Sequence, residues 1–154
     1  MSAALQFSDL LPKVPRLPLS EVPEVSAYFK NTLRAMFGED EDKDRSYVQE
    51  ITQTPWTPER MRERLVGIED GEALKSAMRR LRRDVMMNLV ARDISGLANL
   101  EEVVTVMSDL AEIAIDRTVS VYAKELAKRF GVPRSETGVP QDLICLLYTS
   151  DAAD

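Results

Sequence analysis

The chain has 154 residues, a length that fits one domain or one lobe of a larger protein. Its 44% hydrophobic and 30% charged residues exclude disorder of the whole chain. The net charge of -6 argues against nucleic-acid or anionic-membrane binding, and no apolar run reaches the roughly 18–20 residues that cross a bilayer. The start lacks a secretory signal, so we expect a cytoplasmic protein. Histidine, the commonest general base and metal ligand, is absent from the sequence.

The last ten residues, 145–154, match the translation of a sequencing-library adapter in one reading frame. The alternative is a native terminal strand, because Leu-Leu-Tyr-Thr has good β propensity. We interpret the segment as an artefact and exclude it from the fold. Without it the chain loses its one cysteine, Cys145, and the loss of Asp151 and Asp154 changes the net charge from -6 to -4.

Residues 1–23 are expected to form an N-terminal segment and a linker held extended by its four prolines, Pro12, Pro15, Pro18 and Pro23. The spacing of the first three also fits a proline-rich docking motif. Such spacing is common in plain linkers, which we take as the better interpretation.

Short helices are expected over residues 24–69. Apolar residues recur at three- and four-residue steps from Glu24 to Phe37, where Gly38 would end a helix. A second helix is expected to about Val66, opened by Thr57 as N-cap with proline at the first helical position.

The acidic run of residues 39–44 has some of the character of a calcium-binding loop. However, Arg45 stands where such a loop requires glycine, and Ile51 stands where it requires a bidentate glutamate. We therefore predict a solvated acidic loop, followed by a short turn of helix over residues 47–51.

Two long helices are predicted over residues 70–133. The first runs from about Asp70 to Ser95, and the second begins after Asn99, which forms a capping box with Glu102, and ends at Phe130. Because the turn between them is short, they should form an antiparallel hairpin. The stripe expected to be buried on the second helix contains Leu100, Val103, Val104, Met107, Leu110, Ala111, Ala114, Thr118, Val121 and Tyr122.

An arginine cluster, Arg79, Arg80, Arg82 and Arg83, is predicted opposite the apolar stripe of the first long helix. Such a face could contact nucleic-acid phosphates, but the acidic chain and the lack of interleaved aromatic residues favour a solvated or internally paired face. Docking of the cluster against a partner domain or an acidic protein stays open.

Arg92 falls on the apolar side of the same helix, so we expect it to bond carbonyls or an acidic side chain; contact with a neighbouring catalytic domain is the alternative. Asp109, Glu112 and Asp116 share a face; the lack of histidine and of further clustered acids argues against a dinuclear metal site, so we expect a solvated face. The methionines are interpreted as core filler: Met61, Met78, Met86, Met87 and Met107.

No phosphate loop, nucleophile arrangement or zinc spacing occurs, so no catalytic, cofactor-binding or metal residue is predicted.

Several stretches carry a resemblance to a known family. They are Arg82-Arg83, the run from Ala91 to Val103 (Ala-Arg-Asp-Ile-Ser-Gly-Leu-Ala-Asn-Leu-Glu-Glu-Val), Leu110-Ala111, Lys128 to Pro133, and Gly138 to Ile144. Through them the chain resembles the bacterial glutamine synthetase adenylyltransferase/adenylyl-removing enzyme family. It departs from the family at Asn88, where the family commonly has arginine. This position lies in a scaffold helix, so the departure puts no catalytic role in doubt.

The resemblance implies a mainly α lobe that is truncated at the first strand of a nucleotidyltransferase α/β domain, with residues 134–144 as the lead-in. The family's glycine loop and paired aspartates, which would hold phosphates and magnesium, follow that strand and match no position here. The fragment is therefore expected to be inactive and to bind no Mg, ATP, ADP or phosphate.

In the full-length family, one unit removes AMP from a tyrosine of glutamine synthetase by phosphorolysis and the other attaches AMP from ATP, under control of glutamine and a PII-type signal protein. The position of Met1 favours the N-terminal, adenylyl-removing unit. The alternative is a stand-alone helical protein-interaction module, and a nucleic-acid binder comes third.

Overall fold

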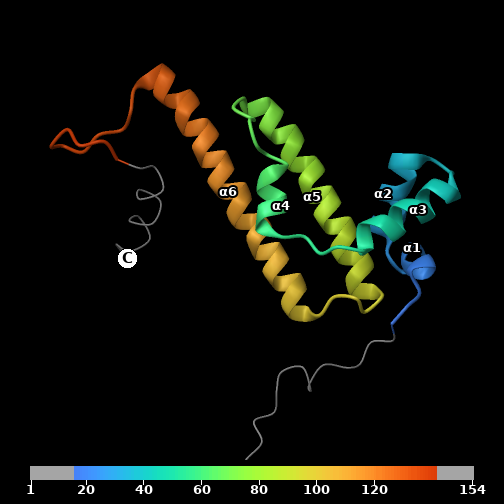
Figure 1. Ribbon diagram of the computed structural model, residues 1–154. Helices are drawn as coiled ribbons and strands as arrows, with labels where there is room; N and C mark the ends of the chain where they lie inside the picture. Colours follow the sequence, from blue (N-terminus) through green and yellow to red (C-terminus); the bar gives the residue numbers. More distant parts are fainter. Residues whose placement is uncertain (1–15, 142–154) are drawn as a thin grey trace, which may run out of the picture. The chain divides into compact units, whose positions relative to one another are not determined.

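The computed structural model describes residues 16–141. In chain order these form η2 (Leu19–Glu21), α1 (Val22–Val25), α2 (Ala27–Phe37), α3 (Glu41–Thr52), α4 (Pro58–Glu63), α5 (Gly71–Ile94) and α6 (Leu100–Phe130) (Figure 1). Within this range, extended backbone pairs at an isolated bridge between Arg134 and Pro140. The prediction of a mainly α chain is confirmed. None of the described helices combines the length and apolar character needed to span a bilayer.

The chain divides into two compact units, and α5 contributes to both. The described part of the first unit is 16–54 with 88–99; that of the second is 55–87 with 100–141. The end of α5 therefore belongs to the first unit, whereas its start belongs to the second with α4 and α6.

In the first unit, the helix expected from Glu24 is interrupted at Ser26. This residue adopts an extended conformation (φ -123°, ψ 101°), and its hydroxyl accepts a 3.3 Å hydrogen bond from the amide of Phe29, which caps α2. The core of the unit is built on buried residues of these short helices, including Val22, Phe29, Leu33 and Val48.

The proline-rich linker is shorter than predicted. Pro18 is extended, but residues 19–21 form a 3-10 turn, and Pro23 lies in the first turn of α1, where its missing N–H leaves no hydrogen bond unmade. Val22, between them, is fully buried. The predicted extension through residue 23 is wrong from residue 19 onward, and the earlier prolines lie outside the described residues.

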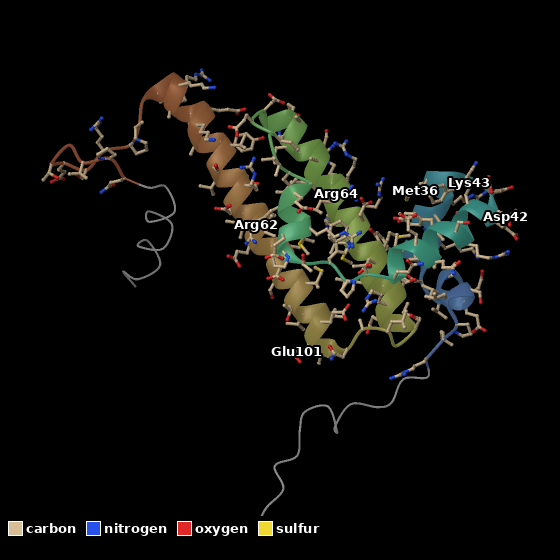
Figure 2. All side chains as sticks on the ribbon, in the orientation of Figure 1. Met36, Asp42, Lys43, Arg62, Arg64 and Glu101 are labelled. Atoms are coloured by element: carbon tan, nitrogen blue, oxygen red, sulfur yellow. The ribbon has the colours of Figure 1, made fainter. Side chains whose placement is uncertain are left out.

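The acidic run is the first turn of a helix rather than a loop. Asp40 caps α3 by accepting a hydrogen bond from the amide of Lys43, and the carboxylates that follow lie at the helix N-terminus, where the helix dipole favours negative charge. Asp42 and Lys43 project outward from this helix (Figure 2). The prediction of a solvated loop is wrong because carboxylates at the start of a helix are stabilised by the free amides and the dipole of its N-terminus.

The second unit is assembled around α4. Thr57 caps this helix as predicted, accepting from the amide of Arg60, but α4 ends at Glu63 rather than near Val66. α4 packs on α6, and Figure 1 shows it between the two long helices. Met61 and Leu65 are fully buried there.

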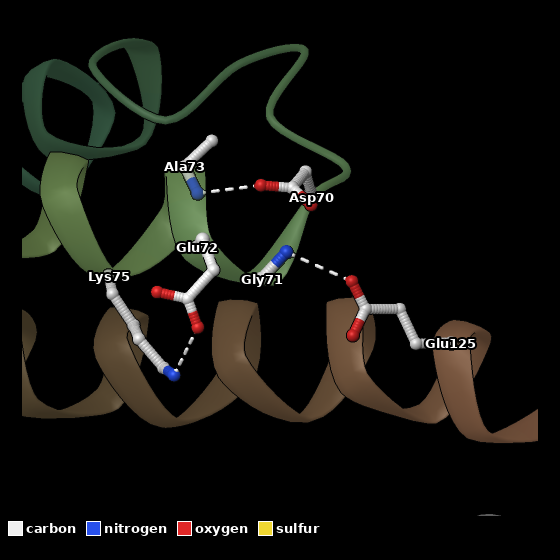
Figure 3. Close-up of polar contacts among 6 residues, drawn as sticks. All are labelled: Asp70, Gly71, Glu72, Ala73, Lys75 and Glu125. Atoms are coloured by element: carbon white, nitrogen blue, oxygen red, sulfur yellow. Dashed lines mark hydrogen bonds and ion pairs between the residues drawn. The ribbon is translucent and has the colours of Figure 1, made fainter.

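The start of α5 lies on the later half of α6 (Figure 3). The side chain of Asp70 accepts from the amide of Ala73 (2.8 Å), and the amide of Gly71 donates to the carboxylate of Glu125 (2.9 Å). A Cβ at Gly71 would lie 2.9 Å from the ring of Tyr122, so this close approach favours glycine. The two long helices therefore run antiparallel, as the hairpin prediction required.

The buried stripe of α6 differs from the predicted one. Leu110 and Val121 are buried as predicted, but the other buried residues are Val106 and Ile113, whereas the expected core residues Leu100, Val104 and Met107 are exposed. α4 approaches on the side of the buried residues, roughly a quarter turn around the helix axis from the stripe that the sequence favours.

Candidate functional site

The buried polar side chains of the first unit lie at the end of α5. Arg92 is only 7% exposed, and its guanidinium donates to the carbonyls of Thr52 (2.8 Å) and Leu97 (3.3 Å). The first carbonyl belongs to the last residue of α3, and the second lies in the turn after α5. The expectation that Arg92 bonds carbonyls on the apolar side of the helix is confirmed, and Arg92 fastens the end of α3 to the turn after α5.

The turn that Arg92 holds is a Schellman motif. The amide of Leu97 donates to the carbonyl of Arg92 (2.7 Å), and that of Gly96 donates to the carbonyl of Asp93 (2.9 Å). Gly96 has φ +68°, which glycine adopts without strain. The Arg-Asp-Ile-Ser-Gly-Leu stretch therefore contains both the turn that ends α5 and the arginine that donates to a carbonyl of this turn. We name Arg92, with this turn and the carbonyls it bonds, the Arg92 clip.

Asn88, one turn before Arg92, contributes to the same attachment. Its side chain is 1% exposed, and its amide nitrogen donates to the carbonyls of Ile51 and Thr54, the latter at 3.1 Å. Where the resemblance leads us to expect arginine, the shorter asparagine reaches the carbonyls at the end of α3. These partners lie 37 and 34 residues away in the chain, so no local pattern predicts them.

Arg117 is the equivalent residue of the second unit, and sequence reasoning missed it. Its guanidinium donates to the carbonyls of Ile68 (2.9 Å) and Leu65 (3.4 Å), in the segment between α4 and α5. A helical wheel places Arg117 among Val106, Leu110, Ile113 and Val121, and this was the signal that could have identified it. An arginine on the true buried side of a helix is expected to satisfy carbonyls.

An aromatic contact strengthens the start of α4. Trp56 is buried, and the guanidinium of Arg60 lies 4.2 Å from its ring centroid, with that of Arg64 at 5.7 Å. Such stacking contributes on the order of 0.5–1 kcal/mol at partly exposed sites. These arginines are therefore part of the packing of the second unit.

The arginine cluster of α5 is exposed except for one member. Arg83 is half-buried and forms an ion pair with Asp84 (2.8 Å). Arg79, Arg80 and Arg82 form no ion pair with another described residue. The structure thus agrees with a solvated face for three arginines and pairs the fourth.

Charged pairs shift a few ionisation equilibria without creating a reactive group. A hydrogen bond from the Lys43 ammonium (2.8 Å) lowers the pKa of Asp40 and raises the pKa of Lys43. The ammonium of Lys124, 2.9 Å away, similarly lowers the pKa of Glu69. Partial burial, followed by repulsion from Asp40, raises the pKa of Asp44. These shifts belong to helix ends and surface pairs.

The described residues show no cluster of potential metal ligands. Among residues 16–141, no three acidic, cysteine or histidine side chains are placed to hold a metal ion. Asp109, Glu112 and Asp116 lie on one side of α6 as predicted, with Glu112 and Asp116 exposed. The lead-in that the resemblance places before a phosphate loop reaches the end of the described residues.

The observed polar architecture defines a helical scaffold, in which buried arginines satisfy backbone carbonyls. The sequence profile of the glutamate-ammonia ligase adenylyltransferase family matches residues 19–149, and the chain belongs to this family. The match includes residues 145–149 of the segment interpreted as adapter-derived, and that interpretation stays a prediction.

Curated relatives carry the name bifunctional glutamine synthetase adenylyltransferase/adenylyl-removing enzyme. The Bordetella pertussis protein is 42% identical over 74 residues, which are 47% of this chain and 8% of that protein. The Chromobacterium violaceum protein is 41% identical over 81 residues, 52% of this chain and 9% of that protein. The matches thus span less than a tenth of these relatives. No solved structure significantly matches the chain.

Proposed function

We propose that this chain is the helical segment that supports a nucleotidyltransferase domain in a bifunctional glutamine synthetase adenylyltransferase. The observation that carries the proposal is the Arg92 clip: the residues most specific to the resemblance end a helix and satisfy buried carbonyls. Such residues fix the shape of a support, and they offer no group for proton or nucleotidyl transfer. The proposal extends to the N-terminal, adenylyl-removing unit of such an enzyme as the place of this segment.

In the proposed whole enzyme, glutamine synthetase is the substrate protein and a PII-type signal protein is a regulatory partner, in the cytoplasm. Magnesium with ATP, ADP and phosphate would bind in the nucleotidyltransferase domain of that enzyme. Magnesium would supply charge neutralisation on phosphate oxygens there.

The proposed inactivity of this chain is tested by its own assay. The 154-residue protein is incubated with adenylylated glutamine synthetase, magnesium and inorganic phosphate, and ADP formation is measured. The intact B. pertussis relative serves as the comparison protein. We expect no ADP above background from the chain alone, and measurable turnover would show that a reactive site is present.

The supporting role is tested in a chimera in which residues 19–144 of this chain, the family-matched range without the segment interpreted as adapter-derived, replace the corresponding segment of the B. pertussis relative. We expect Arg92→Met in the chimera to reduce both the melting temperature and adenylyl removal. Arg80→Met, an exposed arginine of the same helix, is the matched control and should change neither. Unchanged melting of the Arg92→Met chimera would contradict a supporting role for the clip.

The second candidate function, a stand-alone interaction module, is favoured by the exposed Arg79, Arg80 and Arg82. If this surface is functional, a poly-glutamate peptide should bind at physiological salt, and binding should be lost when the three arginines are replaced by glutamine. We expect no such binding. We also expect no binding to duplex DNA; a DNA affinity that falls steeply with salt would support the third interpretation.

A further inference from the structure

α6 carries an exposed apolar stripe on the side that does not contact α4. We define the α6 stripe as Leu100, Val104, Met107, Ala111 and Ile115, whose spacing keeps them within roughly 80° of the helix circumference. Leu100 is 49% exposed, Val104 55%, Met107 38% and Ile115 61%. Single exposed apolar residues are common on protein surfaces, but a continuous row at helical spacing is typical of a surface that binds another element.

The stripe has a defined electrostatic border. The residues that share its side of the helix over roughly four turns are apolar or neutral, because only Ser108 and Thr118 accompany the stripe. Next to it, on the side away from α4, lie the exposed Glu101 and Glu112, and the exposed Asp116 follows further around the helix; none of the three forms an ion pair with another described residue. We call these three carboxylates the acidic rim. A partner that covers both the apolar row and its acidic border is expected to carry positive charge along the matching edge.

A second copy of this chain fits the stripe poorly. Two α6 helices paired antiparallel about a two-fold axis would place one acidic rim against the other, and like charges at that separation repel. In a parallel pair, the acidic rim of one α6 would face the flank of the other α6 that lies opposite its own rim, and α4 already packs on that flank. The partner is therefore expected to differ in charge from α6.

We propose that the α6 stripe binds an amphipathic helix in the remainder of the polypeptide, with an apolar row bordered by lysine or arginine. The match to the B. pertussis relative covers 8% of that protein, so most of such a polypeptide is available to supply the helix. The apolar row would cover the stripe, and the basic border would neutralise the acidic rim. This proposal rests on family membership and not on which activity the enzyme unit has.

The experiment measures protection of the stripe from a thiol reagent. Ile115→Cys is introduced together with Cys145→Ser in the 154-residue chain, and alone in the chimera, and maleimide labelling is followed by mass spectrometry of the labelled peptide. We expect rapid labelling in the isolated chain and at least tenfold slower labelling in the chimera. Val66→Cys, at a 75% exposed site on the same unit but outside the stripe, is the control and should label rapidly in both proteins.

A second variant tests the charge of the partner. Glu112→Lys with Asp116→Lys in the Ile115→Cys chimera should restore labelling several-fold, because a basic border would then meet a basic rim. Equal labelling of Ile115→Cys in the isolated chain and the chimera would overturn the proposal. Protection in the isolated chain that increases with its concentration would also overturn it, in favour of a second copy.

The folding of the chimera does not limit this test. Should its circular dichroism show no cooperative melting, the same cysteines are placed at the aligned positions of the intact B. pertussis relative. Because labelling needs no catalytic turnover, a chimera without adenylyl-removing activity that still protects Ile115→Cys would contradict the proposed activity and leave the stripe proposal supported.

Discussion

Replacing Arg92 with methionine tests whether the clip stabilises the first unit. Methionine keeps much of the apolar stem and removes the guanidinium, which donates to the carbonyls of Thr52 and Leu97. A hydrogen bond from a charged donor contributes about 1.5–3 kcal/mol, and the second bond is long and partly exposed. The relief of burying a charge offsets part of the loss. We therefore expect the first unit to lose about 2–3 kcal/mol, a large share of the 5–15 kcal/mol that is usual for a domain.

Hydrogen exchange resolves this loss to the first unit. The amides of Leu97 and Ala98 donate to the carbonyl of Arg92, so their protection reports the integrity of the clip. A loss of 2–3 kcal/mol corresponds to about 30- to 150-fold faster exchange at these amides. The fluorescence of Trp56, the one tryptophan of the chain, follows the second unit during denaturation in urea.

Arg80→Met is the control for this prediction, since Arg80 is exposed on the same helix and forms no ion pair with another described residue. Its effect should stay within about 0.5 kcal/mol. If Arg92→Met accelerates exchange at Leu97 and Ala98 less than threefold, the two carbonyl bonds do not stabilise the turn and the assignment of the clip as support is refuted.

Three further perturbations test the second unit. Arg117→Met should cost about 1–3 kcal/mol in urea denaturation and accelerate exchange over residues 64–70, whereas unchanged exchange there would show that the loop does not need its two carbonyl bonds. Trp56→Ala removes a buried ring and should cost about 3–5 kcal/mol by the same measurement; a loss below 1 kcal/mol would contradict its burial. The pair of Glu69 with Lys124 should be pH-dependent: because the folded-state pKa of Glu69 lies below its ordinary 4.5, its stabilisation is present above pH 4.5 and is lost as the pH falls through the folded value. Glu69→Gln should therefore lower the melting temperature slightly at pH 7 and not at pH 3, and an equal effect at both would exclude the ion pair as the cause.

The elements whose residues alternate clearly between apolar and polar faces could be predicted from the sequence. α5 and α6 begin and end within a residue or two of the expected positions, because caps and glycines mark their ends. The acidic run at the start of α3 was missed because carboxylates at a helix N-terminus resemble a solvated loop in composition. The local sequence is compatible with a loop and with a helix N-terminus, and the hydrogen bond from the amide of Lys43 to Asp40 identifies it as a helix N-terminus.

The buried side of α6 and the partners of the arginines depend on contacts that local sequence does not contain. The wheel of α6 has two adjacent apolar sectors, and the position of α4 decides that Val106 and Leu110 are buried while Val104 is exposed. Burial of Arg92 was predictable from its wheel position, but its carbonyl partner at Thr52 lies 40 residues away in the chain. No periodic pattern identifies such a pairing.

The Arg92 clip joins two segments that are separated in sequence by all of α4 and most of α5, so the first segment is synthesised on the ribosome well before its partner. Residues 16–54 of the first unit emerge before residues 88–99, which complete that unit. Until then the carbonyls at the end of α3 lack the side chains of Asn88 and Arg92. A translation stop between residues 55 and 87 would thus leave α1, α2 and α3 as an incomplete unit, open to proteolysis and to wrong pairing with other nascent chains.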